Sequence, residues 1–268
     1  MDIYTSIEAI SILSFILFSL LCFTRIENNT DINKIAYLFT LFFQAFLGFV
    51  YYVFVFNFIA NKLALVASLL IVILFSIFFI LSMLSFQFIR LRVLFVPFFL
   101  IIIIFRFLIC ISSLDKTNDV QLFESQYLVI HIITSLLSYS LITISLVTSF
   151  CIFIQDSNIK QMRYNRLINN FLPSLYESEI LAIRFLYLTI IFLIISLVTG
   201  LYYFIETGDN LIYFFNEKVI FSLISLFLTL MIIIVRMYRG LSGKMVFKMI
   251  LLSYLLISFS YFGVRLLN

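Results

Sequence analysis

The stretch "YLVIHIITSLLSYSLITISLVTSFCIFI", residues 127–154, contains no Asp, Glu, Lys or Arg. It is longer than the roughly 20 apolar residues that a helix needs to cross the hydrocarbon core of a bilayer. A transmembrane β-strand is about half as long and alternates between apolar and polar residues, which this stretch does not do. The stretch therefore predicts a membrane-spanning helix.

The rest of the chain has the same character. Of its 268 residues 64% are hydrophobic and 11% are charged, and the mean hydropathy is +1.21. A soluble domain could not bury so much apolar surface. We expect an all-α, polytopic membrane protein that forms a single integral-membrane domain over residues 1–268, with about eight spans. The predicted spans are Ile3–Phe23, Ile35–Phe58, Leu63–Phe86, Val93–Ser113, Tyr127–Ile154, Ile183–Ile205, Val219–Val235 and Met245–Leu266.

Basic residues in the connections predict the orientation. One side of the membrane has Arg25, Lys34, Arg90, Arg92, Lys160, Arg163, Arg166, Arg184, Arg236, Arg239, Lys244 and Lys248, whereas the other has only Lys62, Lys116, Lys218 and Arg265. The side richer in Lys and Arg is normally cytoplasmic. We therefore expect a multi-pass protein of the bacterial inner membrane with both termini in the periplasm. The net charge of +4 reflects this topology and gives no reason to expect a nucleic-acid partner.

His131 is the only histidine and lies near the outer end of the fifth predicted span. Hydroxyl residues at helical spacing from it, Thr134, Ser135, Ser138, Ser145 and Ser149, give that helix one polar face. Polar groups in a membrane helix face the bundle interior, and ionisable ones often have a function. His131 is thus either a ligand or a packed side chain that bonds a neighbouring helix.

Arg106 lies in the fourth predicted span at a depth similar to that of His131. Because the connection "LDKTNDVQLFES" is short, we expect the fourth and fifth spans to be neighbours. A cation beside an imidazole suits an anionic ligand with a metal centre, such as haem with its propionates. The alternative is that Arg106 extends its side chain to the membrane surface.

Other chemistry has little support in the sequence. Cys22, Cys110 and Cys151 stand alone and form no CxxC motif, so a thiol relay or a cysteine-based metal site is not expected. The chain also lacks a phosphate-binding loop. Because no nucleophile, base and oxyanion donor can be grouped, we do not expect an enzyme.

The longest cytoplasmic connection, "QDSNIKQMRYNRLINNFLPSLYESEILAIRF" at residues 155–185, mixes basic and apolar residues before Pro173. It is either a simple tether or an interfacial helix that lies on membrane lipid, with Lys160, Arg163 and Arg166 toward anionic headgroups. Pro173 interrupts any such helix, and Ser174 is a candidate N-cap for the next one.

Three segments together resemble the cytochrome c assembly family of membrane proteins, of the CcsA and HemX type, and most closely its short YpjD-like branch. The first is His131 followed seven residues later by Ser138-Tyr139. The second is "LPSLYESEILAIRFLYLTIIFLIISLVTG", with Pro173, Arg184 and Thr199-Gly200 in the family's order. The third is the pair "RGLSGK" and "SYFGVRLL". The resemblance covers residues 128–268.

The sequence also departs from the family in two ways. The loop "IETGDNLIYFFNEK" is short and the chain has no tryptophan, whereas haem-presenting members have a tryptophan-rich segment there. Near the end of the seventh span, where the family places histidines, this chain has Ile234, Arg236 and Tyr238. Two histidine ligands from one copy are therefore excluded.

The resemblance implies haem handling during cytochrome c assembly, with haem and other assembly proteins as partners. His131 would be one axial ligand, Ser135 or another hydroxyl of the polar face would accept a hydrogen bond from its other ring nitrogen, and Arg106 would be a propionate partner. A second possibility is a scaffold or regulator of haem synthesis or assembly factors that binds no haem. A permease for haem or a small solute is a third, although we find no internal repeat of the kind that transporters have.

Overall fold

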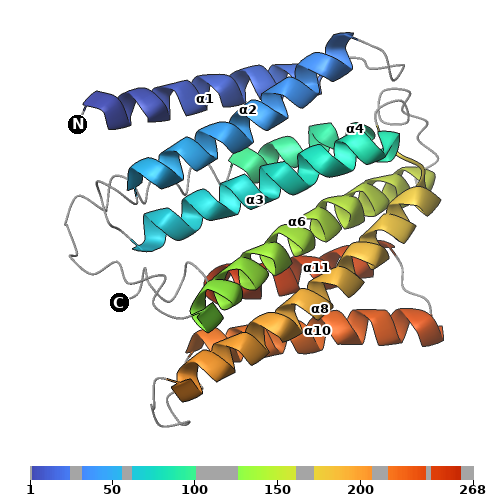
Figure 1. The fold of residues 1–268 in the computed structure, drawn as a ribbon. Coiled ribbons are helices and arrows are strands. Elements are labelled where there is room, and N and C mark those ends of the chain that lie inside the picture. Colours follow the sequence, from blue (N-terminus) through green and yellow to red (C-terminus); the bar gives the residue numbers. More distant parts are fainter. Residues whose placement is uncertain are drawn as a thin grey trace. The chain divides into compact units, whose positions relative to one another are not determined.

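The computed structural model describes most of the chain, and every described segment contains helix (Figure 1). The described residues are 2–24, 32–55, 62–100, 126–160, 172–206, 217–239 and 243–260. No strand occurs in these ranges. The prediction of an all-α protein is confirmed.

The helices overlap all eight predicted spans. They are α1 (Asp2–Cys22), α2 (Ile32–Phe54), α3 (Lys62–Leu84), α4 (Phe86–Arg90), α6 (Gln126–Lys160), α8 (Leu175–Glu206), α10 (Glu217–Arg239) and α11 (Gly243–Ser258), and residues 92–100 are also helical. Within the described residues, five helices are long and apolar enough to cross a membrane: α2, α3, α6, α8 and α10. The chain is thus a multi-pass membrane protein.

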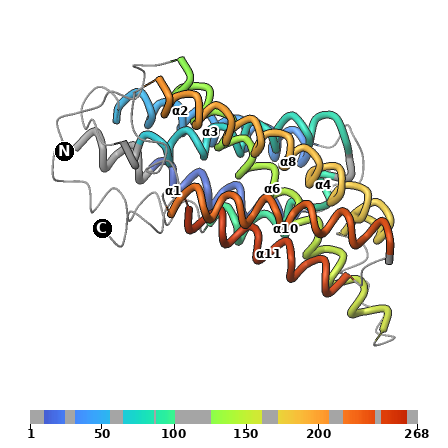
Figure 2. Tube along the Cα trace, turned by 90° about the horizontal axis from the view of Figure 1, so that it is seen from below, coloured from blue at the N-terminus to red at the C-terminus, as the bar shows by residue number. Residues whose placement is uncertain are grey.

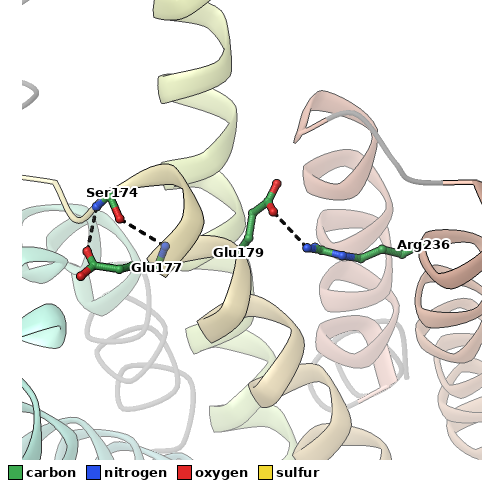
Figure 3. Close-up of polar contacts among 4 residues, drawn as sticks. All are labelled: Ser174, Glu177, Glu179 and Arg236. Carbon is green, nitrogen blue, oxygen red and sulfur yellow. Dashed lines mark hydrogen bonds and ion pairs between the residues drawn. The ribbon is translucent and has the colours of Figure 1, made fainter.

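Helix α8 begins eight residues before the predicted span, at Leu175. The Ser174 hydroxyl accepts a hydrogen bond from the Glu177 backbone N–H (3.3 Å), and the Glu177 carboxylate accepts one from the Ser174 N–H (3.0 Å) (Figure 3). This reciprocal pair is a capping box, which starts a helix where hydropathy alone does not. The prediction of Ser174 as an N-cap is confirmed, whereas the candidate interfacial helix falls largely on residues 161–171, outside the described ranges.

The chain divides into two compact units, Met1–Gln121 and Leu122–Asn268. In the first unit α2 packs against both α1 and α3. Its core is a cluster of aromatic rings, in which Phe78 lies 3.9 Å from Phe95 and Phe75 lies 4.2 Å from Phe99, measured between ring centroids. Gln44 of α2 donates hydrogen bonds to the Ser11 carbonyl and the Ser14 hydroxyl of α1, and so joins the two helices.

Arg92 is buried in the first unit, although its place in the sequence suggests a loop. Its guanidinium donates hydrogen bonds to the carbonyls of Cys22, Thr24 and Ile89. The carbonyls of the last turn of a helix have no partner within the helix and carry a partial negative charge. Arg92 therefore caps the C-terminal end of α1.

The second unit is built on the antiparallel pair α6 and α8. Three cross-helix hydrogen bonds mark the pairing: Gln155 to the Pro173 carbonyl, Ser178 to the Cys151 sulfur, and Ser145 to the Ala182 carbonyl. Helix α11 packs against α6, and Figure 2 shows α10 and α11 running side by side. The family motifs named above all lie in this unit.

Candidate functional site

His131 lies on the second turn of α6 and faces α8. Its Nδ1 atom is 2.7 Å from the Ser196 carbonyl oxygen and 3.3 Å from the Ser196 hydroxyl. Because a carbonyl oxygen only accepts, Nδ1 carries the hydrogen in this contact. In the neutral ring the lone pair is then on Nε2, to which no described group makes a hydrogen bond. The ring is held in the tautomer that leaves Nε2 as a ligand atom.

Gly200, one helical turn beyond Ser196, makes room for this ring. A Cβ atom built on Gly200 would lie 3.0 Å from both Nδ1 and Cε1 of His131, closer than nine in ten real Cβ contacts. The imidazole therefore packs directly on the backbone of α8. This contact gives a physical reason for glycine in the Thr199-Gly200 motif.

An aromatic pair lies at the same end of the two helices. Tyr127 of α6 and Tyr202 of α8 stack with their ring centroids 5.8 Å apart. Both rings are substantially exposed. Tyrosines at the end of a membrane helix typically lie at the membrane–water interface, so the pair places His131 about one helical turn below that level.

The other two predicted site residues, Ser135 and Arg106, are not seen bonded to His131 in the described part of the chain. Ser135 donates its hydroxyl to the Ile132 carbonyl of its own helix (2.8 Å), and the atom bonded to His131 Nδ1 is the Ser196 carbonyl. Arg106 lies outside the described residues. Neither Ser196 nor the packing role of Gly200 was predicted from the sequence, although small residues four apart are a known signal for close helix contact.

The predicted polar face of α6 is buried, as are Ser140, Thr143 and Thr148 on other sides of the helix, but all these hydroxyls are already bonded. Thr134, Ser135, Ser138, Ser140, Thr143, Thr148 and Ser149 each donate to a carbonyl three or four residues earlier in α6, and Ser145 donates to Ala182 of α8. A Ser or Thr bonded in this way satisfies its own polarity within the helix. The face therefore serves close helix packing.

Tyr139 of the Ser-Tyr motif bonds across to α11. Its hydroxyl donates to the Tyr254 hydroxyl (2.9 Å) and lies 3.2 Å from the Ser258 hydroxyl. All three groups satisfy one another inside the bundle. The motif thus joins α6 to α11.

The end of α10, where the family places further histidines, lies far from His131. Arg236 forms an ion pair with Glu179 of α8, with 3.1 Å between Nη2 and Oε2 (Figure 3). Glu179 and Ser196 are 17 residues apart on one helix, which is about 25 Å at 1.5 Å per residue. Side chains at the end of α10 therefore cannot complete the coordination of a metal held by His131.

The described residues contain no group of three or more His, Cys, Asp or Glu side chains that could hold a bare metal ion. Cys22 and Cys151 are buried and free. What the described part offers is a single oriented imidazole at the end of a helix pair. A single imidazole can hold a metal only when the metal brings most of its own ligands, as haem iron does.

The all-helical, multi-pass fold places the chain among the polytopic helical membrane proteins. Comparison with known families is more specific: the chain belongs to the cytochrome c assembly protein family, whose profile matches residues 57–268. Membership supports a role in cytochrome c biogenesis.

One curated relative is an uncharacterized 28.8 kDa protein of Azospirillum brasilense, encoded in a nifR3-like 5′ region. It is 32% identical over 139 residues, which are 51% of this chain and 49% of the relative. The match therefore spans about half the length of that relative. No solved structure matches the chain significantly.

Proposed function

We propose that this protein holds haem at the periplasmic side of the bacterial inner membrane during cytochrome c assembly, with His131 as an axial ligand. It would be a non-enzymatic, eight-span member of the short YpjD-like branch, with both termini in the periplasm. Without tryptophan it lacks the segment with which fuller family members present haem.

The observation that carries this proposal is the 2.7 Å contact between His131 Nδ1 and the Ser196 carbonyl. Histidines that bind metals almost always donate the hydrogen of the other ring nitrogen to an acceptor, which fixes the ring and raises the basicity of the ligand atom. Here the α8 backbone is that acceptor and leaves the Nε2 lone pair for iron. The donor set therefore fits haem.

Haem would be the cargo, and the chain's own residues would bind and orient it. His131 supplies one ligand, so the other axial position is left to water, a partner protein or a second copy. Arg106 is the residue that the sequence suggests for a propionate. Since the α6 hydroxyls donate to backbone carbonyls, they offer few free donors for a path through the membrane, and this favours binding over transport.

The test is to purify the full chain from cells supplied with haem and to record its absorption spectrum. We expect a Soret band that His131→Ala removes. The matched control is Ser149→Ala, which deletes a hydroxyl near the other end of α6 that bonds only its own helix. Absence of the band from the wild type, or a band that His131→Ala leaves unchanged, contradicts the proposal. Stable membrane partners in a pull-down with no haem would instead support the scaffold function.

A further inference from the structure

A partly open pocket lies in the second unit at the end of α8 and α10 that is remote from His131. Its volume is about 180 Å³. It is lined by Ala182, Ile183, Leu186, Tyr187, Ile232, Ile233, Arg236, Met237 and Val246. The lining thus comes from three helices, α8, α10 and α11, and all but two of these side chains are apolar.

The lining changes from floor to rim. Ala182, Leu186, Ile232 and Val246 are buried and form an apolar floor, whereas Met237 at the rim is 75% exposed. Met237 follows Arg236 in the last turn of α10, so the pocket opens near the level where acyl chains meet headgroups. An apolar floor of this kind does not hold water.

Arg236 supplies the polar end of the pocket. It lies within the last turn of α10, at the level where a membrane helix meets the headgroups. The guanidinium has five N–H donors, and its ion pair with Glu179 is a single contact with both side chains partly exposed. Donors remain for a second anion, and a phosphate oxygen is a favourable acceptor for them.

The surrounding charge and the volume favour one kind of occupant. Lys244 and Lys248 are exposed on α11, on either side of the pocket residue Val246 in the sequence, and basic pockets between membrane helices bind anionic headgroups. The pocket is smaller than the 300–1,000 Å³ typical for compact small-molecule ligands. A single acyl chain is narrow enough for this small volume, and an anionic headgroup matches the basic surroundings.

We propose that this pocket binds an anionic phospholipid of the surrounding leaflet, with its phosphate on Arg236 and the upper part of one acyl chain on the apolar floor. The proposal is independent of haem, because the pocket and His131 lie at opposite ends of α8. Glu179 competes with the phosphate for the same guanidinium. Its charge therefore weakens lipid binding.

The experiment is native mass spectrometry of the full chain in detergent, titrated with phosphatidylglycerol, phosphatidylcholine or glycerol phosphate. We expect one phosphatidylglycerol to be retained in preference to phosphatidylcholine, and no retention of glycerol phosphate. Equal retention of the two lipids overturns the proposal. Retention of glycerol phosphate alone also overturns it, because it identifies a phosphate site without a chain.

Variants assign the binding to this pocket. Arg236→Gln should weaken phosphatidylglycerol binding about fivefold, since one basic residue near an anionic headgroup contributes about 1 kcal/mol. Glu179→Gln should strengthen it, and Ala182→Phe, which fills the floor, should abolish it. Arg184→Gln is the matched control, because Arg184 is exposed on the same helix and does not line the pocket.

If Ala182→Phe does not fold, the test rests on Arg236→Gln and Glu179→Gln. Both replace partly exposed side chains, so we expect both variants to fold. Helix content and monodispersity of each variant verify the fold. Binding that is the same in Arg236→Gln as in the wild type, or weaker in Glu179→Gln, overturns the assignment.

Discussion

The two units of the chain fill their interiors with different side chains. The first has aromatic rings in its core, with Phe18, Phe75, Phe78, Phe95 and Phe99 all buried. The second is centred on α6, whose buried positions are mostly aliphatic and hydroxyl side chains in mixed order. Large rings hold helices apart, whereas Ser, Thr and Gly let the backbones of two helices approach each other.

This difference has a functional consequence. Only where a helix presents its backbone to a neighbour can an imidazole bond a carbonyl across the interface, as His131 does with Ser196. Among the described residues of the first unit, the buried cation Arg92 instead donates three hydrogen bonds to carbonyls at helix ends. Among the described residues, the first unit therefore contributes packing, and the second contains the candidate ligand His131.

The largest effect is expected from removing a ring of the aromatic core. Phe78→Ala should lower the free energy of unfolding by about 3 kcal/mol, because the cavity forfeits contacts with Phe95 and Phe99. The measurement is denaturation in mixed micelles followed by circular dichroism. Phe46→Ala is the control, since Phe46 is exposed on α2 and its loss should cost under about 0.5 kcal/mol. Equal costs would show that the cluster is not a core.

A smaller effect, but a specific one, is expected at the contact between His131 and α8. Gly200→Ala should displace the ring from Ser196 and weaken haem binding about tenfold, the usual cost of losing the partner of a metal-binding histidine. Because His131 is the only histidine, ¹⁵N-histidine labelling reports on this ring alone. We expect the wild type to show a protonated Nδ1 and the variant to lose that preference.

Gly48→Ala is the matched control in the first unit. Its new Cβ would lie 3.1 Å from the Val72 side chain, so it introduces comparable crowding. It should leave the His131 resonances unchanged. An unaltered histidine spectrum in Gly200→Ala would contradict the positioning role, whether or not the protein binds haem.

The smallest effect is expected from single hydroxyls of α6. Ser145→Ala removes the bond to the Ala182 carbonyl and should cost about 0.6 kcal/mol, the average for such bonds between membrane helices. Ser149→Ala removes a bond within α6 and should cost less. The same denaturation assay measures both. A cost for Ser149→Ala as large as that for Ser145→Ala would mean that its hydroxyl has a partner beyond α6.

Hydropathy and turn chemistry predicted much of this fold. The apolar runs identified the helices, Ser174 was recognised as a cap, and the hydroxyl face of α6 was correctly expected to be buried. Helix ends were less well predicted, because α8 starts in a polar segment that the capping box makes helical.

The candidate site could be predicted only in part. The sequence singles out His131 because it is unique, but the partner of its ring is a backbone carbonyl, a group that every residue has. Arg92 shows the same limit: its sequence position suggested a cytoplasmic loop, and only the fold brings the end of α1 to it. The distance between His131 and the end of α10 likewise depends on helix pairing, which composition does not reveal.

The pairing of α6 with α8 also suggests an order of folding. Its cross-helix contacts join residues 18, 27, 37 and 65 positions apart, from Gln155 at one end to His131 at the other. Because closing a longer loop costs more entropy, the contacts nearest the connection should form first. His131 then meets Ser196 last, so a ligand that requires this contact binds only the completed hairpin and stabilises it.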